Sequence, residues 1–147
     1  MKQRIYLSII IILSIFIASC TTGNTVKKDI SKLGPKEVVS SYYNAFANKD
    51  YETMYALISD GFKKIEPTAK DFNTFKAYIS KYYNTASYIK LIDVSEESND
   101  GETVLISYKV ELGLNAGKKD LESSFTVKKK VNGWKLVHPY GENIDTS

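Results

Sequence analysis

The sequence is poor in the residue types from which many sites are built. Among 147 residues it has one cysteine, Cys20, and one histidine, His138. An intramolecular disulfide and a cysteine-ligated metal site are therefore excluded, and the fold has to be held by packing. The chain also lacks a phosphate-binding loop, a nucleophile elbow and any metal-ligand spacing. We expect no cofactor and no metal.

Charge of one sign is not in large excess. Lysine and arginine number 20 and aspartate and glutamate 17, which gives a formal net charge of +3. Two of the basic residues, Lys2 and Arg4, precede a segment that we expect to be removed. So small a surplus argues against a nucleic-acid partner.

Long apolar runs are absent except at the N-terminus, where residues 5–17 carry no charge. This run is shorter than the roughly 20 residues that cross a bilayer, and it has the length of a signal-peptide core. It ends in Ile17-Ala18-Ser19-Cys20. These four residues resemble the lipobox of bacterial lipoproteins. The resemblance implies that Cys20 becomes the first residue of the mature chain and carries a diacylglycerol in thioether linkage.

This resemblance predicts an extracytoplasmic protein, anchored in the bacterial cell membrane by the two acyl chains on Cys20. Thr21 follows in place of aspartate, so the outer membrane stays open as the location in an organism with two membranes. The alternatives are an uncleaved signal anchor and a simple secretory signal followed by a free thiol.

Composition then divides the chain into four parts. Residues 1–19 are the predicted signal peptide, and residues 20–34, small and polar, are the lipidated cysteine with a flexible tether. Residues 35–141 are long enough for one domain with a core, and residues 142–147 form a C-terminal tail.

The first half of the domain has helical periodicity. A helix is predicted from Pro35, a second from an N-cap at Asp50, and a third from about Lys70 with Asp71 or Thr68 as its cap. The segment from Phe62 to Pro67 is interpreted as a short edge strand or a loop, because proline and a pair of lysines suit an exposed edge.

The second half alternates with the period of β-strands. Strands are predicted at 87–94 and 103–112, with a turn at 95–101 and a loop at 113–120, and a third strand begins at Leu121. Asn132-Gly133 predicts a type I′ hairpin turn into a last strand, where Trp134, Leu136 and His138 share a face. The predicted class is α+β, with three N-terminal helices packed on a curved antiparallel sheet of about four strands.

This layout resembles the NTF2-like (cystatin-like) superfamily. The residues that carry the resemblance are Pro35–Val39, Tyr42–Phe46, Lys49–Tyr51 and Val131–Leu136. The resemblance implies a cone-shaped domain whose interior is an active site, a ligand site, or a space filled by side chains. These motifs are structural, so they indicate fold rather than activity.

Seven aromatic residues would line such a pocket, with plain hydrophobic core as the alternative. Buried tyrosine hydroxyls need partners, which favours a partly open cavity over a dry core. The seven residues are Tyr42, Phe46, Tyr55, Phe75, Tyr108, Phe125 and Trp134.

Two residues are weak candidates for a general base. Asp93 lies on the first strand, where simple alternation gives it the face of Ile89 and Leu91, and His138 lies on the last strand. Lys128-Lys129-Lys130 is interpreted as an exposed strand surface, with contact to headgroups or an anionic polymer as the alternative.

Three functional hypotheses follow. The first is a non-enzymatic module, tethered to the membrane, that binds an unidentified protein, a wall component or a small apolar ligand. The second is a small hydrolase, isomerase or dehydratase that uses Asp93 or His138 with a tyrosine. The third is an envelope assembly part that forms homodimers through its sheet.

Overall fold

The computed structural model describes residues 29–139. The predicted signal peptide, Cys20 and the tail over 142–147 lie outside the described residues. In chain order the elements are η1 (Ile30–Lys32), α1 (Pro35–Ala47), α2 (Tyr51–Leu57), α3 (Asp60–Ile65), η2 (Pro67–Ala69), α4 (Phe72–Tyr82), β1 (Ala86–Asn99), β2 (Thr103–Leu114), β3 (Gly117–Lys130) and β4 (Gly133–Leu136).

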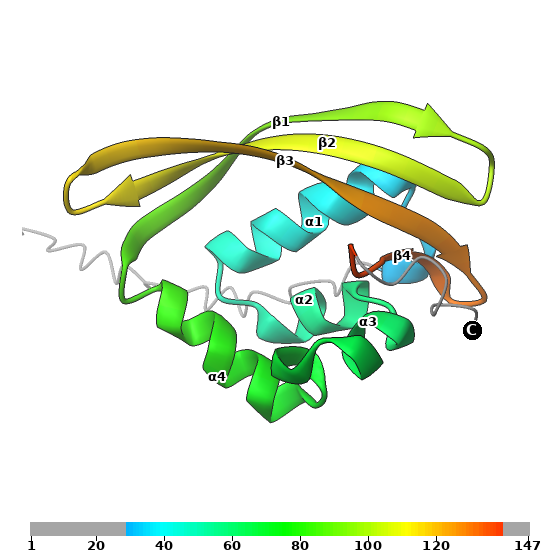
Figure 1. The fold of residues 1–147 in the computed structure, drawn as a ribbon, viewed down its shortest axis with the longest axis horizontal. Coiled ribbons are helices and arrows are strands. Elements are labelled where there is room, and N and C mark those ends of the chain that lie inside the picture. Colours follow the sequence, from blue (N-terminus) through cyan, green and yellow to red (C-terminus); the bar gives the residue numbers. More distant parts are fainter. Residues whose placement is uncertain (1–28, 140–147) are drawn as a thin grey trace, which may run out of the picture.

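The four strands form one antiparallel sheet in the order β1-β2-β3-β4. The sheet curves over α1, and α2, α3 and α4 lie on the other side of α1 (Figure 1). The α+β class and the curved four-stranded sheet are confirmed. The number of α-helices is four within residues 29–139, one more than predicted.

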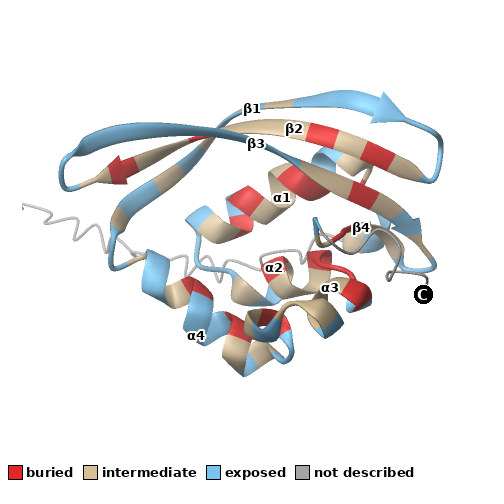
Figure 2. Ribbon diagram, viewed as in Figure 1, coloured by how far each residue is buried: buried red, intermediate tan, exposed pale blue. Residues whose placement is uncertain are grey.

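Helix α1 occupies the concave face of the sheet. Pro35 stands at its first position, where its lack of an N–H costs no hydrogen bond. The Glu37 side chain accepts a hydrogen bond of 2.9 Å from the Gly34 N–H, a donor at the helix start that has no partner within the helix. Val38 and Val39 are fully buried, and Figure 2 shows buried residues on α1 and on the sheet above it. Burial of these apolar side chains fixes α1 against the sheet.

The three shorter helices each begin at a polar side chain that accepts a backbone N–H. Asp50 caps α2, Ser59 caps α3 and Asp71 caps α4. The predicted N-caps Asp50 and Asp71 are confirmed, and α4 begins at Phe72. Such caps stabilise a helix by roughly 0.5–2 kcal/mol each, which matters most for α2 and α3 because they are so short.

The prediction for the segment from Phe62 to Pro67 is wrong. It belongs to α3 and the start of η2, and not to a strand or a loop. Asp60 lies in the first turn of α3 and Lys63 and Lys64 in the last, an order that complements the helix dipole. This charge order explains why a lysine pair, read as an edge signal in the sequence, is helical here.

The long strands extend further than the sequence alternation indicates. β1 continues through the predicted turn to Asn99, and β2 and β3 leave only residues 115 and 116 between them, where a loop over 113–120 was predicted. Ladder pairs such as Glu111↔Asp120 and Leu112↔Lys119 hold this extension. The side chains of these extended parts are mostly exposed. Because neither face of the strands is buried there, the sequence shows no alternation of apolar and polar residues.

Three register shifts interrupt the pairing of β1 with β2. One falls between Leu91 and Asp93: Leu91 pairs with Val110, and Asp93 pairs with Lys109. A bulge of this kind inserts one residue and changes the face on which later side chains lie. Uniform alternation predicted that Asp93 shares the face of Ile89 and Leu91. Because of the bulge, Asp93 lies on the opposite face of the sheet.

The β3–β4 hairpin lies where the Asn-Gly pair predicted it, but its turn is not type I′. Positive φ belongs to Gly133 (94°), whereas Asn132 is not among the positive-φ residues, and Gly133 pairs with Lys130. Val131 therefore stands at the first central position of the turn. A β-branched residue there avoids the left-handed region that type I′ requires.

The end of the predicted tether is part of the fold. Residues 30–32 form η1, Leu33 is only 3% exposed, and the Ser31 backbone lies against Gly133. A Cβ on Gly133 would come within 2.7 Å of the Ser31 carbonyl oxygen. Leu33 belongs to the hydrophobic core. Residues 29–34 are therefore part of the folded domain and not of a flexible tether.

Candidate functional site

A cluster of packed aromatic rings lies between α1 and the concave face of the sheet. The Tyr43 ring lies 4.8 Å from that of Tyr108, which stacks on Phe125 at 5.1 Å; Tyr42 meets Phe125 edge-on at 5.9 Å. Burial raises the pKa of Tyr43 and of Tyr42, and for Tyr43 a hydrogen bond with Tyr108 adds to the effect. Three predicted pocket residues are thus brought together, with Tyr43 as a fourth member that the sequence analysis missed.

The other predicted pocket residues lie in separate clusters. Phe46 packs on Tyr83, whose hydroxyl donates a hydrogen bond to the Phe46 carbonyl. Tyr55 packs on Phe75 with ring centroids 5.4 Å apart. Trp134 is half-buried on β4 and packs against the core. The seven aromatic residues therefore do not line one common pocket.

Asp93 lies on the outer face of the sheet and is exposed. It borders an open trough of about 550 Å³, together with Ser107, Lys109, Glu122 and Ser124. The Lys109 ammonium is 3.0 Å from the Glu122 carboxylate and 3.1 Å from that of Asp120. The trough is polar and open to solvent.

His138 lies just beyond the end of β4, beside α3. Its ring meets Phe62 edge-on at 5.0 Å, and its Nε2 is 3.4 Å from a carboxylate oxygen of Glu66; the side chain is 12% exposed. Hydrogen bonds from Thr68, and then the contact with His138, lower the pKa of Glu66. Asp93 and His138 thus lie on different elements, each among its own neighbours.

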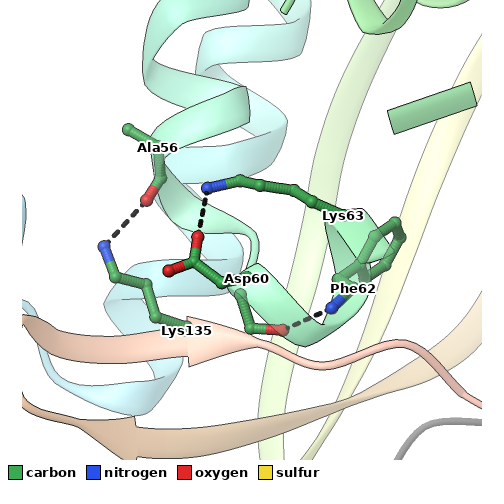
Figure 3. A network of polar contacts seen from close by, with 6 residues as sticks. Ala56, Asp60, Phe62, Lys63 and Lys135 are labelled. Atoms are coloured by element: carbon green, nitrogen blue, oxygen red, sulfur yellow. Dashed lines mark hydrogen bonds and ion pairs between the residues drawn. The ribbon is translucent and has the colours of Figure 1, made fainter. Parts of the chain in front are cut away.

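A cleft lined by lysines was missed by the sequence analysis. It has a volume of about 240 Å³ and lies between the end of α2, the start of α3 and the β3–β4 hairpin (Figure 3). Its lining includes Asp60, Lys63, Lys130, Val131, Asn132 and Lys135.

Two of these lysines approach each other from different elements. Lys135, on β4, donates a hydrogen bond of 2.8 Å to the carbonyl of Ala56, and Lys63, on α3, lies 2.9 Å from Asp60 (Figure 3). The Lys63 ammonium also lies 4.7 Å from the Tyr55 ring centroid, within the range of a cation–π contact. Burial, and then the charge of Lys63, lowers the pKa of Lys135.

The only signal of this cleft in the sequence is the run Lys128–Lys130. Lys63 belongs to the segment predicted as edge strand or loop, and Lys130 and Lys135, which line the cleft with it, are distant from it in the chain. The cleft therefore depends on the tertiary fold.

Residues 29–139 contain neither a candidate metal-binding cluster nor a candidate membrane-spanning helix. That part of the chain has no group of three His, Cys, Asp or Glu residues that could hold a metal ion. It also contains no helix with the length and hydropathy needed to cross a membrane.

Comparison with solved structures finds the same fold in several bacterial proteins. A SEC-C motif protein from Rhodopseudomonas palustris has a TM-score of 0.52 at 13% identity, over 71% of this chain and 75% of that one. A SEC-C motif protein from Psychrobacter arcticus has a TM-score of 0.52 at 12% identity, over 71% and 59%. A protein from Thiobacillus denitrificans, described by its similarity to the association domain of calcium/calmodulin-dependent protein kinase type II, has a TM-score of 0.51 at 16% identity, over 71% of this chain and 90% of that one.

At such identities these likenesses concern the fold alone. A comparison with curated proteins gave no significant match. The model of a sequence family described as the NTF2-like N-terminal transpeptidase domain, by contrast, matches residues 34–139. The resemblance to the NTF2-like superfamily is thereby confirmed, and because the match covers most of the chain, the protein belongs to the family of NTF2-like N-terminal transpeptidase domains.

Proposed function

We propose that this protein is a lipid-anchored, extracytoplasmic module of a bacterial cell envelope that works by binding a partner and not by catalysis. The anchor rests on the sequence: a charge-free run over residues 5–17, the lipobox-like Ile17–Cys20, and a sole cysteine at the position that lipidation requires. Two acyl chains on Cys20 would hold the domain at the membrane.

The observation that carries the binding role is the aromatic cluster between α1 and the concave face of the sheet. In an NTF2-like enzyme we would expect a general base inside the cone, beside space for a substrate. Here the rings of Tyr43, Tyr108 and Phe125 pack together at that place. The two candidate bases lie elsewhere: Asp93 on the outer face of the sheet and His138 beside Glu66.

The family supports a partner in the cell envelope. Its description places related domains in transpeptidases, and we propose that this chain likewise serves the envelope, by binding a protein or a wall component through its surface. A small apolar ligand is the weaker version of this proposal, because the aromatic rings already occupy the concave face.

The anchor is tested by metabolic labelling of the producing bacterium with a radioactive fatty acid. The wild-type protein should carry the label, and the Cys20→Ala variant should not. Equal labelling of the two, or a natural protein that begins at Met1 with a free thiol, would refute the anchor.

The binding role is tested on protein isolated from its own membrane. Mild in-cell crosslinking, followed by mass spectrometry of purified wild type, should give one reproducible adduct. The adduct should persist in Asp93→Asn and His138→Ala, since neither residue is assigned a catalytic task. A turnover activity that either substitution abolishes would overturn the proposal.

Two alternatives stay open, each with an observation in its favour. The His138–Glu66 contact is the arrangement of a histidine base with an orienting carboxylate, and it favours a small hydrolase, isomerase or dehydratase. The exposed outer face of the sheet is the surface through which an assembly part would dimerise. Measurement of particle mass for the detergent-solubilised protein discriminates the dimer.

A further inference from the structure

We propose that the lysine-lined cleft and the adjacent tip of the β3–β4 hairpin bind the phosphate of an anionic phospholipid headgroup, so that this end of the domain rests on the membrane. The proposal deepens the proposed function and, in its choice of a lipid as the source of the phosphate, rests on the anchor at Cys20. The charge and shape of the cleft stand independently of the anchor.

Charge is the first argument. The cleft is lined by three lysines, Lys63, Lys130 and Lys135, and by one carboxylate, that of Asp60. Lys63 already pairs with Asp60, whose side chain is 78% exposed, whereas Lys135 reaches a backbone carbonyl. An anion in the cleft would gain from both ammonium groups. It would also reduce the repulsion between Lys63 and Lys135 that contributes to the lowered pKa of Lys135.

Size limits the ligand. Pockets for drug-sized ligands measure roughly 300–1,000 Å³, and this cleft measures about 240 Å³. It therefore suits one phosphate-sized group whose remaining parts extend into solvent or into a lipid layer. Lysine is a common phosphate ligand that acts as a point charge.

The second, independent observation is Val131. Its exposure is 103%, at the tip of the hairpin and on the rim of the same cleft. Turns normally carry polar residues or glycine, and none of residues 29–139 buries this side chain. An apolar residue among lysines is the pattern of surfaces that enter the headgroup region of a bilayer.

The path of the chain brings this surface to the membrane. The Ser31 backbone lies against Gly133, two residues after Val131 in the chain. Eight residues lie between Cys20 and Asp29, and the nine residue steps that join the two span at most ~30 Å when extended. A diacylated Cys20 would thus hold the hairpin within reach of the headgroups.

The single tryptophan, Trp134, provides the assay, because it lies on β4 and pairs with Lys129 beside the cleft. The full-length protein, processed in its bacterium, is reconstituted into phosphatidylcholine vesicles with or without phosphatidylglycerol. Both carry a spin label on a phosphatidylcholine headgroup. Quenching of Trp134 should be several-fold stronger with phosphatidylglycerol and should decrease with added salt.

Matched variants separate the cleft from bulk charge. Substitution of glutamine for Lys63, Lys130 and Lys135 together should abolish the phosphatidylglycerol dependence. A lysine near an anionic surface changes the ratio of docked to undocked domains by about fivefold. The control replaces Lys81, Lys90 and Lys119, which are exposed and outside the cleft, and should retain the dependence. Val131→Ser should weaken quenching without altering thermal unfolding.

The outcomes distinguish the anchor from the cleft. Protein that stays with neutral vesicles but shows no phosphatidylglycerol dependence keeps the anchor and overturns this inference. Equal losses in the two triple variants also overturn it. Protein that leaves neutral vesicles refutes the anchor. In that case, binding of the protein to phosphatidylglycerol vesicles supports the lipid-binding role of the cleft, and failure to bind them refutes it. If millimolar inorganic phosphate removes the quenching, a soluble phosphate is the preferred occupant and the lipid assignment fails.

Discussion

Two glycines provide a matched test of how the N-terminal segment is held on the domain. Gly101, in the β1–β2 turn, and Gly133, at the start of β4, have nearly the same φ, 92° and 94°. A Cβ on Gly101 would meet nothing within 4 Å, whereas a Cβ on Gly133 would meet the Ser31 backbone oxygen at 2.7 Å and Cα at 2.9 Å. Alanine therefore imposes the same dihedral cost at both positions but displaces η1 at only one of them.

The magnitudes follow from the two contributions. Left-handed φ costs an L-residue about 1–2 kcal/mol, and the less flexible unfolded chain recovers about 0.4–1 kcal/mol, so Gly101→Ala should lower the free energy of unfolding by about 1 kcal/mol. Gly133→Ala should cost this and also part of the burial of Leu33, which is 3% exposed. Full burial of a leucine side chain contributes about 1.5–3 kcal/mol, and we expect a total of about 2–4 kcal/mol.

The assay is urea unfolding of the full-length protein in detergent, followed by the fluorescence of Trp134, with hydrogen exchange of residues 30–33 as a local readout. Exchange there should accelerate in Gly133→Ala and stay unchanged in Gly101→Ala. The contact that blocks Cβ is with Ser31 backbone atoms, so adding Ser31→Ala should not rescue Gly133→Ala. Equal destabilisation by the two glycine substitutions, or rescue by Ser31→Ala, would refute the reasoning.

Three further predictions concern stability. Burial raises the pKa of Tyr43, so the folded state keeps the phenol proton that the unfolded state loses above pH ~10; stability from this residue is complete below pH ~10 and should fall by about 1.4 kcal/mol per pH unit above it. Tyr43→Phe should show a correspondingly smaller alkaline slope in urea titrations, and an unchanged slope would contradict this. Ser59→Ala removes the α3 cap, which accepts the Phe62 N–H at 2.9 Å, and should cost about 1–2 kcal/mol by calorimetry, whereas Ser59→Thr should cost less. Met54→Ala should cost about 2–5 kcal/mol, because the side chain is fully buried; a loss under 1 kcal/mol would show that the core collapses around the gap.

Local sequence signals predicted the caps and the class of the fold. Asp50 and Asp71 cap their helices because an oxygen one residue ahead of a helix satisfies backbone donors whatever surrounds it. The alternating run from Val104 to Leu112 marks β2 because one face of this central strand packs on α1. Such features depend on neighbours in the chain, and for that reason the sequence is sufficient for them.

Features that depend on distant partners were not predictable. The bulge between Leu91 and Asp93 adjusts β1 to the curvature of the sheet, and no residue type marks it. α3 is too short for a periodic stripe, and its cap, Ser59, is not followed by a strong apolar pattern. The lysine cleft joins α3, which ends at Ile65, to β4, which begins at Gly133, so its charges assemble only in three dimensions.

The two edge strands of the sheet, β1 and β4, are each protected against pairing with another strand, but in different ways. β4 is short, and Ile58 already bridges to Leu136 beside it, with the Ser59 N–H bonded to the Leu136 carbonyl at 2.9 Å. β1 is long, but its three register shifts break the regular spacing that a newcomer would have to match. Neither edge is an open template, so the sheet does not favour polymerisation of copies edge to edge.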